Sequence, residues 1–129
     1  MATIFAVTSL DLTPEKRKEL SDVLIEDLGK IYTHAMSLNL AQIPQEDCRG
    51  DSINQTTFFV CVPPYISIDK KRETIKQIHE TMVRETGYQG VLKNIVLFQY
   101  HDDEGVGKDG ELFADTKAKK AAEEAAAQA

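Results

Sequence analysis

The sequence lacks the long apolar runs and the leader-like start that membrane insertion or export requires. No apolar run approaches the roughly 20 residues that cross a bilayer as a helix. The first five residues, Met-Ala-Thr-Ile-Phe, contain neither a basic segment nor the beginning of a long apolar one. We therefore expect no membrane span, no signal peptide and a cytoplasmic location.

Positive charge is also scarce. The chain of 129 residues has 15 lysines and arginines against 21 acidic residues, which gives a formal net charge of −6. Residues 117–129 are slightly basic, so the body of the protein lies near −7. Nucleic acids bind to basic stripes or patches, and an acidic body therefore argues against a nucleic-acid partner.

The motifs of metal, redox and nucleophilic chemistry are missing as well. The two cysteines, Cys48 and Cys61, form no C-x-x-C pair, and the three histidines have no metal-ligand spacing. The sequence has neither a phosphate-binding glycine loop nor a nucleophile elbow. We expect reduced thiols, no metal site and no cofactor.

Two stretches of the chain each have the pattern strand, helix, strand. The first has a strand over residues 3–9, a helix capped by Thr13, and an alternating strand over residues 37–43. The second has a strand over residues 57–62, a helix capped by Asp69 and ending at Gly87, and an apolar strand over residues 94–98. The two units, about 2–45 and 56–100, share the same order of elements, although the sequence identity between them is low.

Two β-α-β units in tandem predict an α+β fold in which a four-stranded sheet carries two helices on one face. Turn formers over residues 105–110, followed by Leu112 and Phe113, predict a C-terminal hairpin. We expect one domain over residues 1–115 and an Ala/Lys/Glu-rich tail over residues 116–129, either a frayed helix or disordered. The bare face of the sheet needs a cover, which oligomerisation usually supplies.

These features resemble the tautomerase superfamily. The resemblance rests on the short N-terminal strand, the Thr13-Pro14 helix start, the repeated unit and the closing Gly-x-Gly-x-x-Gly-Glu-Leu segment of residues 105–112. The 4-oxalocrotonate tautomerases end in a similar segment, and the doubled length is similar to fused members such as cis-3-chloroacrylic acid dehalogenase and malonate semialdehyde decarboxylase. Ferredoxin-like folds share the same order of elements; that alternative predicts a dimer with no apolar pocket at the N-terminus.

The resemblance implies a homotrimer that acts on a small unsaturated or 2-keto acid. In that family the initiator methionine is removed, and the amine of an N-terminal proline, with its pKa lowered by an apolar pocket, serves as acid, base or nucleophile. Arginines hold the substrate carboxylate. This chain departs from the pattern, because residue 2 is alanine and the matching stretches 10–12 and 63–68 contain no arginine. The positions of a family histidine and of the hairpin aromatic fall near Leu28 and Val106.

The resemblance leaves two functions open. The first is a weak or altered keto-enol tautomerase, or a related decarboxylase or hydratase, that uses the amine of Ala2 as its catalytic group. The second is a catalytically inactive member that serves as a binding or structural module. The charged segment Lys70–Arg72 either contacts an anion or a partner or is a solvated face, and Tyr100–Glu104 is either a proton-handling cluster or a solvated loop. We favour solvated surface for both. The candidate substrate-binding residues are Asn39, Gln42, Tyr65, Ser67 and Phe98.

Overall fold

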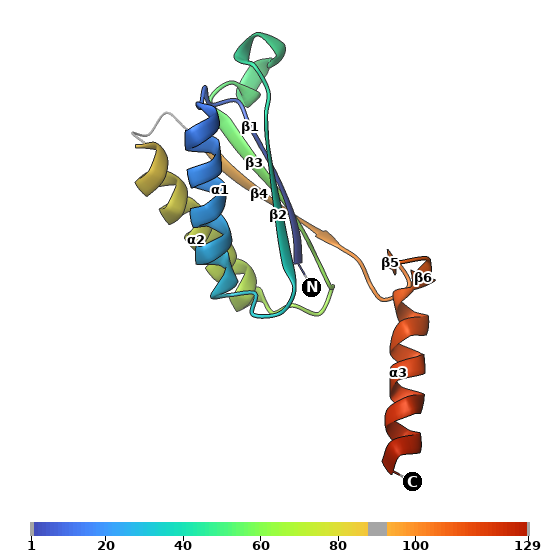
Figure 1. Cartoon of the computed structure of the whole chain (residues 1–129). Helices are drawn as coiled ribbons and strands as arrows, with labels where there is room; N and C mark the ends of the chain where they lie inside the picture. Colours follow the sequence, from blue (N-terminus) through green and yellow to red (C-terminus); the bar gives the residue numbers. More distant parts are fainter. Residues whose placement is uncertain (1, 88–92, 129) are drawn as a thin grey trace.

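The computed structural model describes residues 2–87 and 93–128 and shows a mixed four-stranded sheet with two long helices on one face (Figure 1). The elements are β1 (Ala2–Thr8), α1 (Pro14–Gly29), β2 (Met36–Gln42), the short 3-10 turns η1 (Gln45–Asp47) and η2 (Gly50–Ser52), β3 (Gln55–Val62), α2 (Ile68–Thr86), β4 (Lys93–Tyr100), β5 (Gly107–Lys108), β6 (Glu111–Leu112) and α3 (Phe113–Gln128).

The strand order β2-β1-β3-β4 confirms two β-α-β units lying side by side. β1 pairs in parallel with β2, and β3 pairs in parallel with β4. The two units meet where β1 and β3 pair antiparallel in the middle of the sheet. Because of this pairing, the start of β1 and the end of β3 lie at the same end of the sheet. The expected α+β fold is therefore confirmed.

The first helix begins and packs as its sequence predicts. The Thr13 hydroxyl accepts a hydrogen bond from the Lys16 amide at 3.1 Å, and Pro14 occupies the first turn, where its missing N–H costs nothing. Leu20, Leu24 and Leu28 follow at spacings of four residues and are fully buried. One face of α1 thus covers the sheet.

The second helix begins two residues earlier than the sequence predicted. Ser67 is the N-cap, because its hydroxyl accepts a hydrogen bond from the Lys70 amide at 3.1 Å. Asp69, the predicted cap, instead lies in the first turn and pairs with Arg72 at 3.0 Å. Serine and aspartate are both good caps, so sequence alone could not decide between them. Gly87 ends the helix as predicted, with a left-handed φ of 68°.

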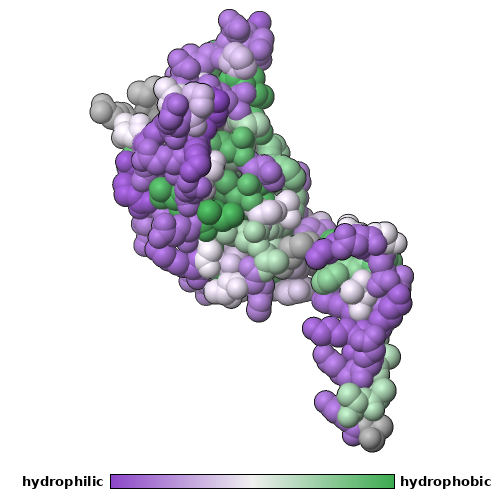
Figure 2. Space-filling view, viewed as in Figure 1, coloured by the Kyte–Doolittle hydropathy of each residue, from purple (hydrophilic) through white to green (hydrophobic). Residues whose placement is uncertain are grey.

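The two faces of the sheet differ sharply. Alternate residues of the central strands, such as Ile4, Phe58 and Val60, are fully buried beneath the helices. On the opposite face, Phe5 and Leu97 are each 46% exposed. Figure 2 shows hydrophilic residues over the helices and hydrophobic residues over the strands beside α1. The second face of the sheet therefore leaves large apolar side chains open to solvent.

The C-terminal part forms the expected hairpin and a helix. β5 and β6 pair across Asp109 and Gly110, whose positive φ values suit a tight two-residue turn. The tail is helical: α3 has no buried residue and extends away from the sheet (Figure 1). Ion pairs from Lys117 to Asp103 and from Lys119 to Glu111 connect the first turns of α3 to the segment that precedes it. No helix in residues 2–87 and 93–128 is long and apolar enough to cross a membrane.

Candidate functional site

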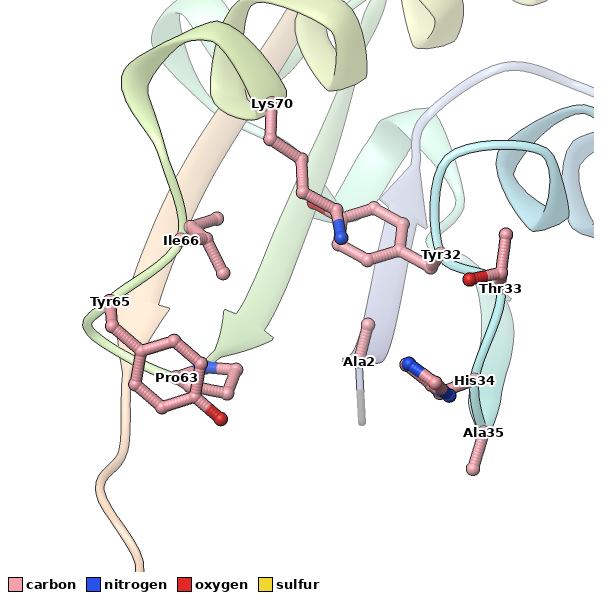
Figure 3. Close-up of a pocket in the computed structure, with 9 residues that line it drawn as sticks. All are labelled: Ala2, Tyr32, Thr33, His34, Ala35, Pro63, Tyr65, Ile66 and Lys70. Carbon is pink, nitrogen blue, oxygen red and sulfur yellow. The ribbon is translucent and has the colours of Figure 1, made fainter.

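A cavity of about 120 Å³ opens at the end of the sheet where β1 begins and β3 ends (Figure 3). Its walls come from the first residue of β1, the loop between α1 and β2, and the turn that connects β3 to α2. The side chains that matter for its chemistry are those of Ala2, Tyr32, His34, Tyr65 and Lys70.

Ala2 forms part of the wall of this cavity and is only 1% exposed. Its nitrogen donates a hydrogen bond to the Ala35 carbonyl at 3.1 Å. This bond and the β1–β2 pairing hold the nitrogen of Ala2 in place. Met1, whose removal the resemblance implies, lies outside the described residues.

Lys70 supplies the positive charge of the cavity. It belongs to the first turn of α2, where cations oppose the helix dipole. Its neighbours contact other partners: Lys71 lies over the Tyr100 ring, and Arg72 pairs with Asp69. The Lys70 ammonium lies 5.0 Å from the centre of the Tyr32 ring and pairs with no carboxylate in the described part of the chain. An ammonium placed in this way can receive an anion.

Tyr32 positions that ammonium. Its hydroxyl lies 2.8 Å from the Thr74 hydroxyl, and Thr74 donates its own proton to the Lys70 carbonyl at 2.8 Å. Tyr32 must therefore donate to Thr74. Burial raises the pKa of the Tyr32 phenol above its usual range. At neutral pH the phenol keeps its proton and its bond.

A second cavity adjoins the first and shares three of its wall residues, His34, Pro63 and Tyr65. Its other walls come from the segment after β4 and from the start of α3. The residues on that side are His101, Asp103, Val106, Phe113 and Lys117. The Ala2 cavity therefore continues outward beneath the C-terminal segment.

The structure brings Ala2 and Tyr65 together and places the four other candidate residues elsewhere. Asn39 is exposed on β2, and Phe98 packs against the hydrophobic core. The Gln42 side chain lies at the far end of β2, where its oxygen accepts from Leu12 and Arg17. Ser67 caps α2.

Of the five side chains that matter for the chemistry of the cavity, three were not among the sequence candidates. Tyr32 and His34 lie in the loop before β2, which carries no motif. Lys70 lies in a segment that the sequence suggested was solvated surface. The one available signal was its place in a first helical turn, where positive charge is unfavourable unless something else requires it.

The described residues contain no group of three or more histidine, cysteine, aspartate or glutamate side chains that could hold a metal ion. The cavity is lined by the first residue of β1, a lysine and hydroxyl-bearing side chains. Such groups suit acid–base chemistry on a small anion.

The sequence matches no protein-family model and no curated protein. Known structures are nevertheless similar over most of the chain. A native fused 4-OT superposes with a TM-score of 0.77 at 11% identity, over 89% of this chain and 98% of that one. A malonate semialdehyde decarboxylase inhibited by 3-bromopropiolate gives 0.70 at 13%, over 90% and 96%. A member of the cis-3-chloroacrylic acid dehalogenase family gives 0.69 at 10%, over 85% and 82%. The chain has the fold of the tautomerase superfamily, in its fused form with two β-α-β units.

Proposed function

We propose that the Ala2 cavity binds a small unsaturated or 2-keto acid and interconverts its keto and enol forms. One observation carries the proposal: Ala2 and a lysine with no carboxylate partner in the described residues line the same cavity. The fold supports the same reading, since the similar structures include a fused 4-OT. The amine would come from Ala2 after removal of Met1.

In this mechanism the amine of Ala2 acts as the base. A free α-amine titrates near pH 8, and burial lowers the pKa because it disfavours the charged form. A neutral amine takes a proton from the carbon next to the keto group. The electrons of the C–H bond form the C=C bond, the keto oxygen takes a proton from water, and the hydroxide left behind takes the proton from the Ala2 ammonium, which restores the base. The reverse transfer regenerates the keto form.

Lys70 would hold the substrate carboxylate. An ammonium is a point charge and lacks the two-pronged geometry of an arginine. The held acid is therefore less precisely oriented than it would be between arginines. A primary amine in place of a proline amine changes the base as well. We expect slow turnover for these two reasons. The alternative function is a module that binds acids without converting them, and it would use the same anion site.

The first test is mass spectrometry of the N-terminal peptide of the purified protein. If Met1 is retained, the Ala2 nitrogen is a peptide amide and cannot act as the base. The second is conversion of the enol forms of phenylpyruvate and 2-hydroxymuconate, followed by absorbance in the wild type and in Ala2→Pro. Turnover above buffer that falls in Lys70→Ala and persists in Lys71→Ala supports the enzyme. Acid binding that depends on Lys70 without turnover in either protein assigns the chain to the binding module.

We also propose that the protein forms a homotrimer through the bare face of its sheet. Phe5, Ile95 and Leu97 give that face an apolar centre, and exposed patches of this kind mark interfaces. Fused 4-OT structures with the same fold are described as trimers. Sedimentation should give three times the chain mass of 14.4 kDa; a dimer would contradict this assembly.

A further inference from the structure

His34 lines both cavities, and the chemistry of Ala2 and Lys70 leaves it without a role. Two backbone contacts fix its place in the loop before β2. The Tyr32 amide donates to the Leu28 carbonyl at 2.9 Å, and the carbonyl of the next residue, Ala35, accepts from the Ala2 nitrogen at 3.1 Å. In Figure 3 the imidazole ring points toward Ala2. The loop therefore presents the ring to the cavity that the first residue of β1 lines.

The His34 imidazole can exchange protons with solvent. Its side chain is exposed, and no carboxylate pairs with it in the part of the chain that the structure describes. The charged groups of the second cavity, Asp103 and Lys117, compensate each other at 3.1 and 3.2 Å. The ionisable side chains that line either cavity with His34 are Tyr32, Tyr65, Lys70, His101, Asp103 and Lys117. Nothing in this set holds the imidazole in a single protonation state.

The keto oxygen needs a proton when the enol forms, and the other polar side chains of the first cavity are poor sources. The Tyr32 hydroxyl donates to Thr74, and burial raises the pKa of its phenol above the usual range. Lys70 is engaged by the carboxylate in the proposed reaction. A phenol such as that of Tyr65 gives up its proton far less readily near neutral pH than an imidazolium does. An imidazole both gives and takes protons in that range, which makes His34 the suitable group.

We infer that His34 is the second acid–base group of the reaction and acts at the substrate oxygen, while Ala2 acts at the carbon. This inference rests on the proposed function. In the enol-to-keto direction, the neutral imidazole takes the enol O–H proton, and the electrons of that bond form the C=O bond. The C=C electrons take a proton from the Ala2 ammonium and form the new C–H bond. The imidazolium then returns a proton through solvent to the Ala2 amine, so that both groups are restored.

The test is the pH dependence of enol-to-keto conversion of phenylpyruvate by the full chain. A neutral imidazole and a protonated amine predict a bell-shaped profile of kcat. His34→Gln should lower kcat about 100-fold at neutral pH, keep KM within about threefold and lose the acidic limb, while the basic limb set by Ala2 remains. His101→Gln is the matched control, because His101 lines only the second cavity, and it should keep the rate and both limbs.

Rescue by imidazole separates proton transfer from a structural effect. Added imidazole should raise kcat of His34→Ala by at least about tenfold and leave the wild type and His101→Gln unchanged. If His34→Gln keeps the acidic limb, whatever its kcat, His34 is not the group at the oxygen and the inference is overturned. The proposed function still stands in that case, provided that turnover falls in Lys70→Ala. Absence of turnover in the wild type overturns both.

Discussion

The Lys70 ammonium lies 5.0 Å from the centre of the Tyr32 ring, and Tyr32 is connected to the backbone of the same lysine through Thr74. The Thr74 hydroxyl accepts from Tyr32 and donates to the Lys70 carbonyl. The three residues therefore form a closed set of contacts between the loop before β2 and the first two turns of α2. A rigid arrangement of this kind reduces the entropy lost when Lys70 binds an anion.

Replacing Tyr32 should therefore weaken acid binding. Tyr32→Leu removes both the ring beneath the ammonium and the bond to Thr74, and a cation–π contact is worth about 0.5–2 kcal/mol. We expect the Kd for phenylpyruvate to rise about threefold to tenfold. Tyr100→Leu removes the equivalent contact of Lys71 outside the cavity and should leave the Kd unchanged. Equal losses in the two variants would show that the effect does not come from the cavity.

The cap of α2 gives a second prediction. Ser67→Ala should lower the free energy of unfolding by about 1 kcal/mol, because the Lys70 amide loses its partner. Asp69→Ala removes only an exposed pair with Arg72 and a favourable charge in the first turn, so its effect should stay within about 0.5 kcal/mol. Urea unfolding of both variants measures the difference. If Asp69→Ala lost more unfolding free energy than Ser67→Ala, Asp69 would be the N-cap, as the sequence pattern predicted.

The fold was predictable because its signals are local. The Thr13-Pro14 start, the leucines of α1 and the turn formers of residues 105–110 each specify structure within a few residues. The four-stranded sheet with both helices on one face followed from the repeat of the pattern, whereas the antiparallel pairing of β1 with β3 is known only from the structure. The cap of α2 could not be chosen in the same way, because Ser67 and Asp69 are both suitable.

The cavity was only partly predictable because it is assembled from distant segments. Ala2 and Tyr65 could be proposed from the resemblance, but Tyr32 and Lys70 belong to different β-α-β units and come together only because the two units pack side by side. The sequence pattern suggested that the Gln42 side chain could bind substrate. In the structure its side-chain oxygen already accepts hydrogen bonds from the Leu12 amide and the Arg17 guanidinium. Sequence patterns give the face of a strand; they do not give the partner of a side chain.

Asp27 gives a prediction about acid stability. This carboxylate of α1 is nearly buried and accepts hydrogen bonds at 2.7 Å from both Arg84 and Thr81 of α2. The Arg84 bond first, and then the Thr81 bond, hold the pKa of Asp27 below its ordinary value of 3.8. A depressed folded-state pKa stabilises the protein above the unfolded-state pKa, and this stability is lost as pH falls through the folded-state value.

Asp27→Asn should therefore be less stable than the wild type by about 1–3 kcal/mol at pH 7. The gap should stay constant down to about pH 5 and narrow below about pH 4. Urea unfolding at several pH values measures it. Asp22→Asn is the control, since Asp22 forms only an exposed pair with Lys18 and should cost at most about 0.5 kcal/mol. If the difference in unfolding free energy grew as the pH fell, Asp27 would not be a stabilising carboxylate in the folded protein.

The bare face of the sheet gives the last prediction. A charge at its centre should prevent assembly, because burying an unpaired charge in an apolar interface costs several kcal/mol. Leu97→Lys should sediment as a monomer while its far-UV circular dichroism stays that of the wild type. Ile75→Lys is the matched control: Ile75 is also 46% exposed, but it lies on α2, outside the proposed interface, and should leave the assembly intact. If Leu97→Lys kept the wild-type mass, the face would not be the contact between subunits, and the apolar groups at Phe5 and Leu97 would need another partner.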